Sequence, residues 1–110
     1  MHKVIVLYHP PKDPLHFRKY YEQKHLPLVA KMPGLKSSRH SFDLAAPGGP
    51  PPYFCIWEGE FADAATAGAS MQSEIGDRVA ADAANYADGG LVIFSFTPID
   101  SQHSGDVHER

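Results

Sequence analysis

Three short runs of the sequence are apolar at nearly every position: residues 4–8 (VIVLY), 53–57 (YFCIW) and 91–96 (LVIFSF). Such runs, bounded by turn formers such as Pro10 and Pro11, are typical of strands buried on both faces. The chain has only two helical regions, and we expect both to lie on the same side of a sheet. The other face then needs a cover, and a second copy of the same sheet is the simplest one.

The first helical region begins near Asp13, a good N-cap residue, and Pro14, which fits the first helical position. Apolar side chains then recur at three-to-four spacing, at Phe17, Tyr20, Tyr21, Leu28, Val29 and Met32. Pro27 lacks a backbone donor, so we expect the helix to bend or restart there. Pro33 and Gly34 mark its end.

The second helical region is the alanine-rich stretch 62–87, which Gly68 and residues 73–76 interrupt, so it is predicted as two pieces. Residues 35–44 alternate weakly and predict a more exposed strand. The resulting order, βαββαβ, predicts an α+β fold of the ferredoxin-like type with an antiparallel four-stranded sheet. We expect residues 1–100 to form one domain of a dimeric α/β barrel and residues 101–110 to form a polar C-terminal tail.

Size and composition narrow the class of protein. The chain has 110 residues, 43% of them hydrophobic, and a formal net charge of -3, without a run of Lys or Arg. These values predict one soluble domain that binds no nucleic acid. No stretch is long and apolar enough to cross a membrane, and the apolar start lacks a signal cleavage site. The single cysteine, Cys55, cannot form an internal disulfide, so a cytoplasmic location is expected.

The chain resembles the EthD family of dimeric α/β-barrel proteins over nearly its whole length up to the polar tail. The resemblance rests on residues 24–28 (KHLPL) followed by 33–35 (PGL), on the tyrosine pair ahead of them, on Phe61, and on residues 81–88 (ADAANYAD). It implies a homodimer of ferredoxin-like subunits. Known relatives are associated with bacterial breakdown of ether fuels and with small cyclic or aromatic metabolites.

The resemblance does not fix the reaction. The wider barrel superfamily contains cofactorless monooxygenases, lactone isomerases and haem proteins, so fold analogy leaves the chemistry open. Relatives resembling methylmuconolactone isomerases use a histidine at the position matched by His25 and a cysteine on the third strand near Cys55. The resemblance therefore makes these two residues candidates for the site.

His25 is the catalytic candidate. It follows Tyr21 by four residues and precedes Leu28 by three, so its ring is expected to point toward the sheet. We expect it at a helix end, where the macrodipole favours the protonated ring and Pro27 disturbs the backbone. Such a group can exchange protons near neutral pH. The alternative is a structural histidine that caps the last carbonyls of the helix.

Five further residues are candidates for substrate binding: Tyr21, His40, Phe42, Cys55 and Trp57. Tyr21 can orient a ligand oxygen, while Phe42 and Trp57 suit the wall of a cavity. His40 and Arg39 are neighbours on a strand, so only one of them can face the cavity. A cysteine in a buried strand is more often an inert small hydrophobe than a nucleophile.

No cofactor or metal is expected. The seven histidines form no HxH or HxxxH pair, and no second cysteine completes a zinc set. The two glycines at positions 48 and 49 are flanked by prolines and do not open a helix, so they do not form a nucleotide loop.

The leading hypothesis is a cofactor-independent enzyme, of isomerase or lyase type, that binds an apolar, oxygen-containing small molecule and uses His25 as acid and base. One alternative is a non-catalytic binding or accessory protein of an oxidative degradation system, and another is a cofactorless monooxygenase. An enzyme should have His25 facing a cavity with a second polar group within hydrogen-bond reach. A carrier can leave His25 bonded to backbone in a wholly apolar cavity.

Overall fold

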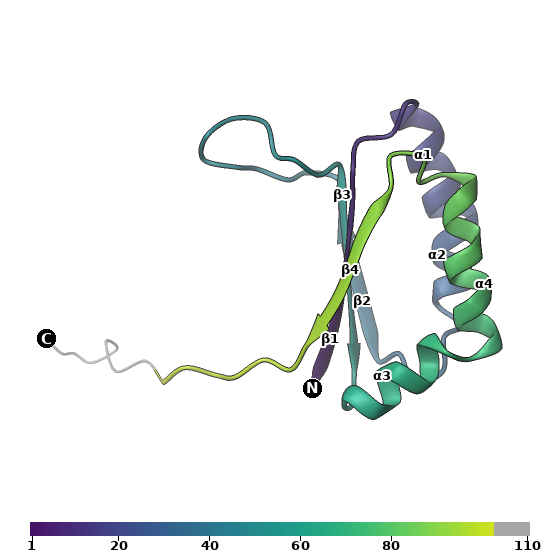
Figure 1. Cartoon of the computed structure of the whole chain (residues 1–110), viewed down its shortest axis with the longest axis vertical. Helices are drawn as coiled ribbons and strands as arrows, with labels where there is room; N and C mark the ends of the chain where they lie inside the picture. The colour runs from purple at the N-terminus through teal and green to yellow at the C-terminus, as the bar shows by residue number, and fades with distance from the viewer. Residues whose placement is uncertain (103–110) are drawn as a thin grey trace, which may run out of the picture.

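The computed structural model describes residues 1–102, which form one antiparallel sheet covered on one face by helices (Figure 1). The strands are β1 (His2–Tyr8), β2 (Ser37–Ser41), β3 (Cys55–Phe61) and β4 (Leu91–Phe96), in the order β2-β3-β1-β4. With the helices between β1 and β2 and between β3 and β4, this is the predicted ferredoxin-like βαββαβ arrangement. The fold class expected from the sequence is confirmed.

The helical layer has two parts. The first consists of α1 (Pro14–Tyr20), a π-helical turn η1 (Tyr21–His25) and α2 (Leu26–Val29). The second consists of α3 (Ala64–Met71), α4 (Glu74–Asp82) and a 3₁₀ turn η2 (Ala83–Asn85). Side-chain caps begin three of the helices, because Asp13, Asp63 and Ser73 each accept a hydrogen bond from a backbone N–H three residues later.

The π-helical turn lies where the sequence predicted a disturbance. The N–H of Leu26 donates to the carbonyl of Tyr21, five residues back, and helical geometry continues through Pro27 to Val29. Proline cannot donate a backbone hydrogen bond, and single π-helical turns are frequent at functional sites. The extra residue in this turn places Tyr21 and His25 on the inner face of the helical layer, where both are buried.

Two strands differ from their predicted bounds. The apolar run 53–57 predicted the third strand, whereas β3 is Cys55–Phe61 and includes both Glu58 and Glu60. These glutamates lie on the outer face of the sheet and pair with Lys3 at 3.0 Å and 3.4 Å. Ion pairing on an exposed face therefore allows a polar segment to extend the strand. The second strand is also shorter than predicted, covering only five residues of the stretch 35–44.

The core fills the space between the sheet and the helical layer. Val4, Val6 and Tyr8 of β1 alternate toward the helices and pack with Trp57 and Phe61 of β3. Phe17 and Tyr21, both fully buried, contribute aromatic rings from the helical side. Tyr8 contacts both of these rings edge-on, with centroids 5.3 Å and 5.5 Å apart.

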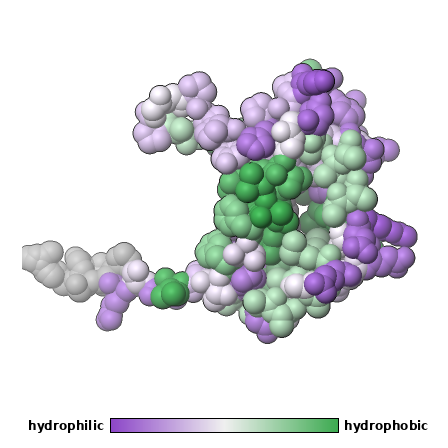
Figure 2. Space-filling model, in the orientation of Figure 1, coloured by the Kyte–Doolittle hydropathy of each residue, from purple (hydrophilic) through white to green (hydrophobic). Residues whose placement is uncertain are grey.

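The opposite face of the sheet carries apolar side chains without a covering layer among the described residues. On β4, Val92, Phe94 and Phe96 point to this face, and Phe94 is 47% exposed. Figure 2 shows the corresponding dark green patch. The loop between β2 and β3 and residues 97–102 after β4 both extend away from the helices (Figure 1). Most of the expected polar tail, residues 103–110, lies outside the described residues.

None of the helices among residues 1–102 is long and apolar enough to cross a membrane.

Candidate active site

A cavity of about 120 Å³ lies between the sheet and the helical layer of a single chain. Its wall is mostly apolar and consists of Val4, Val6, Tyr8, Tyr21, His25, Val29, Met32, Trp57, Phe61, Met71, Gly76, Val79, Ala80 and Ile93. Figure 2 shows a hollow between the green patch over β4 and the paler alanine-rich helix. The apolar wall suits a small hydrophobic ligand, and the volume is a little below the roughly 150 Å³ of a cavity that holds benzene.

The π-helical turn brings the imidazole of His25 to this cavity, with only 3% of the residue exposed. Its Nδ1 lies 2.9 Å from Oδ2 of Asp82, at the end of α4. Its Nε2 lies 2.9 Å from the hydroxyl of Tyr86, which follows η2. Both ring nitrogens therefore bond to side chains, and the ring does not cap the helix carbonyls.

The hydrogen-bond partners fix the direction of each donor. An ionised carboxylate only accepts, so Nδ1 of His25 carries the ring proton and Nε2 is the acceptor. Nε2 then accepts from the Tyr86 hydroxyl, whose oxygen lies 2.9 Å from the Tyr8 hydroxyl and accepts its proton. Tyr8 in turn borders the cavity. The result is a continuous chain, Asp82 to His25 to Tyr86 to Tyr8, from a carboxylate to the cavity wall.

Asp82 is held by three donors. Tyr20 donates its hydroxyl to Oδ1 at 2.6 Å, Asn85 donates its amide to the same oxygen at 2.9 Å, and His25 occupies Oδ2. Partial burial pushes the pKa of Asp82 upward, but the three hydrogen bonds outweigh burial and leave the pKa below its usual value. The carboxylate is therefore charged and oriented at neutral pH.

Burial lowers the pKa of His25, and the hydrogen bond and charge of Asp82 only partly oppose that effect. The ring is thus neutral near pH 7, with a basic Nε2. The expectation that a helix macrodipole favours the protonated ring is wrong, for two reasons. The helical segment continues four residues beyond His25 to Val29, and desolvation of the buried ring dominates.

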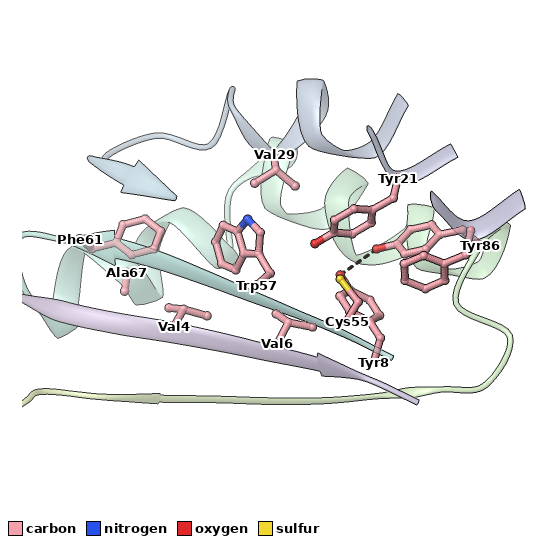
Figure 3. Packing of buried hydrophobic residues seen from close by; sticks show 11 residues of the cluster. Val4, Val6, Tyr8, Tyr21, Val29, Cys55, Trp57, Phe61, Ala67 and Tyr86 are labelled. Atoms are coloured by element: carbon pink, nitrogen blue, oxygen red, sulfur yellow. Dashed lines mark hydrogen bonds between the residues drawn. The ribbon is translucent and has the colours of Figure 1, made fainter. Parts of the chain in front are cut away.

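Two of the predicted binding residues border the cavity. Tyr21 stacks on His25 with ring centroids 5.3 Å apart, and Trp57 lies over the sheet beside it (Figure 3). The hydroxyl of Tyr21 and Nε1 of Trp57 are both buried, and neither finds a hydrogen-bond partner in the described part of the chain. The cavity wall thus holds a histidine whose Nε2 bonds to Tyr86, together with two buried polar groups that lack a well-formed hydrogen bond in the described part of the chain.

The other three predicted binding residues lie outside the cavity wall. His40 is on the helix side of β2, as its pairing with Trp57 requires, but it stands at the sheet edge with Nε2 3.6 Å from Glu22. Phe42 follows β2 and packs against the core rings of Phe17 and Phe54. Cys55 is fully buried behind the wall, where burial raises the pKa of its thiol to about 12 and keeps it protonated.

Sequence reasoning missed Asp82, Tyr86 and Tyr8 as members of the site. Asp82, Asn85 and Tyr86 stand at i, i+3 and i+4 in an otherwise alanine-rich segment, so their spacing puts them on one helix face. That polar group in a small-residue stretch was the available signal. Among residues 1–102, no group of three His, Cys, Asp or Glu side chains is placed to hold a metal ion.

Fold and site together define a ferredoxin-like α+β subunit with a small apolar cavity and a carboxylate-supported histidine in its wall. Residues 9–90 match the EthD domain, and the chain belongs to the EthD family.

Two relatives and one further protein of the same fold are similar to this chain. A Rhodococcus erythropolis protein, described as an uncharacterized 11.0 kDa protein in the thcB-thcC intergenic region, is 34% identical over 93 residues, which cover 84% of this chain and 90% of the relative. An ethyl tert-butyl ether D (EthD) family protein from Bacillus halodurans is 26% identical, with a TM-score of 0.83. The match covers 90% of this chain and 99% of the Bacillus halodurans chain. A dimeric ferredoxin-like protein of unknown function from Jannaschia is 18% identical, with a TM-score of 0.67. The match covers 88% of this chain and 98% of the Jannaschia chain, and this likeness shows the shared fold.

Proposed function

We propose that this protein is a cofactor-independent acid/base enzyme that isomerises or dehydrates a small, apolar, oxygen-containing molecule, with His25 as the proton-accepting and proton-donating group. The observation that carries the proposal is the buried, neutral imidazole at a cavity, with one nitrogen held by Asp82 and the other in contact with the Tyr86 hydroxyl. A base oriented by a carboxylate and facing a hydrophobic pocket suits proton transfer at carbon.

The hydrogen-bonded chain supplies a path for the proton. The substrate C–H bond breaks and its proton passes to the oxygen of Tyr8, while Tyr8 gives its own proton to Tyr86 and Tyr86 gives its proton to Nε2 of His25. Asp82 stabilises the imidazolium that forms. Return of a proton to another carbon completes an isomerisation, and return to a hydroxyl releases water.

The family and its relatives support a role in breakdown of small molecules. The Bacillus halodurans protein carries ethyl tert-butyl ether in its family name, and the Rhodococcus relative is named for its position between two thc genes. These names support our proposal that the chain acts beside a degradation system for apolar compounds. A cytoplasmic location accords with Cys55, which is the only cysteine of the chain and is a free, buried thiol.

We further propose a homodimer that closes two sheets into a barrel. The outer sheet face carries Val92, Phe94 and Phe96, all more than a third exposed, beside the ion pairs of Lys3 with Glu58 and Glu60. An apolar face of this kind is typical of a subunit interface. Similar folds from Jannaschia and Thermobifida fusca are described as dimeric.

The alternative is a binding protein without catalysis. The specific observation in its favour is that both nitrogens of His25 already have protein partners, so the imidazole can be a satisfied structural group. A cofactorless monooxygenase would need aromatic walls, which Tyr21, Trp57 and Phe61 supply, but such walls also suit simple binding.

The test is a ligand screen followed by a chemical one. Thermal shift over lactones, cyclic ketones, phenols and branched ethers identifies classes that bind the folded protein, because bound ligand raises the melting temperature. Compounds that bind are then followed by NMR in D₂O for exchange of their carbon-bound protons. The enzyme proposal expects exchange or isomerisation by the native chain and loss of it in His25→Gln. Binding without any proton exchange or product across the panel would favour the carrier.

A further inference from the structure

Two buried hydrogen-bonding groups at the cavity are without partners. Tyr21 is fully buried and Trp57 is 6% exposed, and neither the Tyr21 hydroxyl nor the Trp57 indole N–H makes a well-formed hydrogen bond in the described part of the chain. The Tyr21 hydroxyl lies beside the Tyr8 hydroxyl and the Cys55 thiol, but neither contact has good hydrogen-bond geometry. Both side chains border the same cavity. A buried polar group left unpaired destabilises the fold, so two of them on one small apolar cavity require an explanation.

The positions of both rings are fixed by their neighbours. The indole of Trp57 lies against Gly59, where an added Cβ would stand 2.2 Å from the ring, so only glycine leaves room for it. Tyr21 stacks on His25 on one side and contacts the ring of Tyr8 edge-on. Figure 3 shows the Tyr21 hydroxyl pointing toward the side of the cluster where Trp57 lies. These donors are therefore preorganised and do not depend on flexible side chains.

We infer that the Trp57 N–H and the Tyr21 hydroxyl form a subsite for the carbonyl oxygen of an otherwise apolar cyclic substrate, a ketone or a lactone. The inference rests on the proposed function and names its substrate class. An indole N–H only donates, so its partner must be an acceptor. A carbonyl oxygen has two lone pairs and can take the N–H and the O–H together, while the remaining wall contacts only hydrocarbon.

The same two donors would assist the proton transfer. When a C–H bond next to the carbonyl breaks and its proton moves to the Tyr8, Tyr86 and His25 chain, the bonding pair forms a carbon–carbon double bond. The π pair of the carbonyl then moves onto oxygen as an enolate, and the step needs no oxidant. Donors aimed at the oxygen where charge develops stabilise that state more than the ground state.

The cavity limits the ring size. The cavity volume of about 120 Å³ is smaller than the roughly 150 Å³ site that accommodates benzene, but the cavity opens to the surface between β4 and α4 (Figure 2), so a six-membered ring with one oxygen is the upper limit for a single chain. Cyclohexanone and methylenecyclohexane are a suitable pair of probes, because they have almost the same shape and only cyclohexanone presents an acceptor oxygen.

The experiment compares the affinities of these two probes. Trp57 is the only tryptophan of the chain, so its fluorescence reports how much probe is bound to the native protein and to Tyr21→Phe. Because Trp57→Phe lacks this signal, probe binding to that variant is measured by calorimetry. We expect native protein to bind cyclohexanone about 10-fold more tightly than methylenecyclohexane, the value of two net hydrogen bonds. Each variant should lose several-fold of that preference and still bind methylenecyclohexane, which shows that the cavity is intact. Tyr53→Phe, a half-buried tyrosine outside the wall, is the control and should keep the full preference.

Equal binding of the two probes by native protein would overturn the subsite, as would an unchanged preference in both variants or failure of both probes to bind. The outcome is separable from the proposed function. A clear oxygen preference without exchange of ring protons contradicts catalysis and keeps the subsite, whereas exchange without a preference contradicts the subsite alone.

Discussion

Nδ1 of His25 lies 2.9 Å from Oδ2 of Asp82, although 57 residues separate the two in the chain. The contact joins the π-helical turn of the first helical part to the end of α4 in the second. It therefore orients the ring at the cavity, and together with the bonds of Tyr20 to Asp82 and of Tyr86 to His25 it links the two parts of the helical layer.

Asp82→Asn should weaken the base. The carboxylate raises the pKa of His25, so its removal lets burial lower that pKa further, and the hydrogen bonds from Tyr20 and Asn85 are also disturbed. We expect proton exchange to fall by roughly 10-fold, less than on removal of the base itself. Stability should fall by about 1–3 kcal/mol. NMR titration of the imidazole measures the pKa of His25, and urea unfolding measures the loss of stability. Asp77→Asn, an exposed change on the same helix, is the control. An unchanged imidazole pKa would contradict the assigned contact.

Stability should fall as the pH drops below the unfolded pKa of histidine, about 6.5. The folded pKa of His25 is lowered, so the unfolded chain binds a proton that the folded chain does not. The stabilisation is complete above pH 6.5 and is lost progressively toward the lowered folded pKa. Urea unfolding at pH 7.5, 6.0 and 5.0 measures the slope, which should be shallower in His25→Asn. Equal slopes in the two proteins would show that the ring titrates normally.

Gly59→Ala should disturb the cavity through Trp57. The added Cβ would lie 2.2 Å from the indole, so the ring must move into the cavity or the strand must shift. Overpacking of this kind costs about 1–3 kcal/mol. The emission of Trp57 should change, and cyclohexanone binding should weaken at least roughly 10-fold, the factor that about 1.4 kcal/mol represents. Gly48→Ala meets no atom within 4 Å and should behave as native protein. Native binding in Gly59→Ala would place the ligand away from the indole.

Phe94→Glu should dissociate the proposed dimer. Phe94 is on the outer face of β4, and a charge placed in an apolar interface removes packing and adds desolvation. A central interface residue contributes about 2 kcal/mol or more to association, so the dissociation constant of the dimer should rise by roughly 30-fold. Sedimentation velocity over a concentration series measures this. Leu15→Glu, on α1 and 80% exposed, is the matched control. If the native chain is monomeric at micromolar concentration, the proposal of a dimeric barrel is wrong.

The sequence predicted the fold because its strong signals are local. The double-sided apolar runs, the Asp13 cap and the interruptions at Gly68 and 73–76 each specify one element, and the order of elements specifies the topology. The burial of His25 was also predictable, since its spacing from Tyr21 defines a helix face. The extent of β3 was not, because Glu58 and Glu60 find their partners on the neighbouring strands: Lys3 of β1 pairs with both, and Arg39 of β2 pairs with Glu58.

The rest of the site could not be predicted because it depends on long-range geometry. Tyr86 reaches His25 across 61 residues and Tyr8 across 78, so these contacts form only when the two helical parts and β1 pack together. His40 shows the same limit. Strand alternation allows the face of the His40 side chain to be inferred, but its position at the sheet edge depends on the strand order, in which β2 is an outer strand.

The central claim is that His25 is the base, and exchange of the ring protons of cyclohexanone next to its carbonyl tests it most directly. His25→Gln keeps an acceptor for the Tyr86 hydroxyl but removes the basic nitrogen, and His16→Gln, an exposed histidine of α1, is the control. In D₂O at pH 7.5 we expect native protein and His16→Gln to catalyse exchange, and His25→Gln to be slower by about 10²-fold to 10⁴-fold at equal probe occupancy. Exchange at the native rate in folded His25→Gln, or no exchange by native protein with bound probe, would contradict the account.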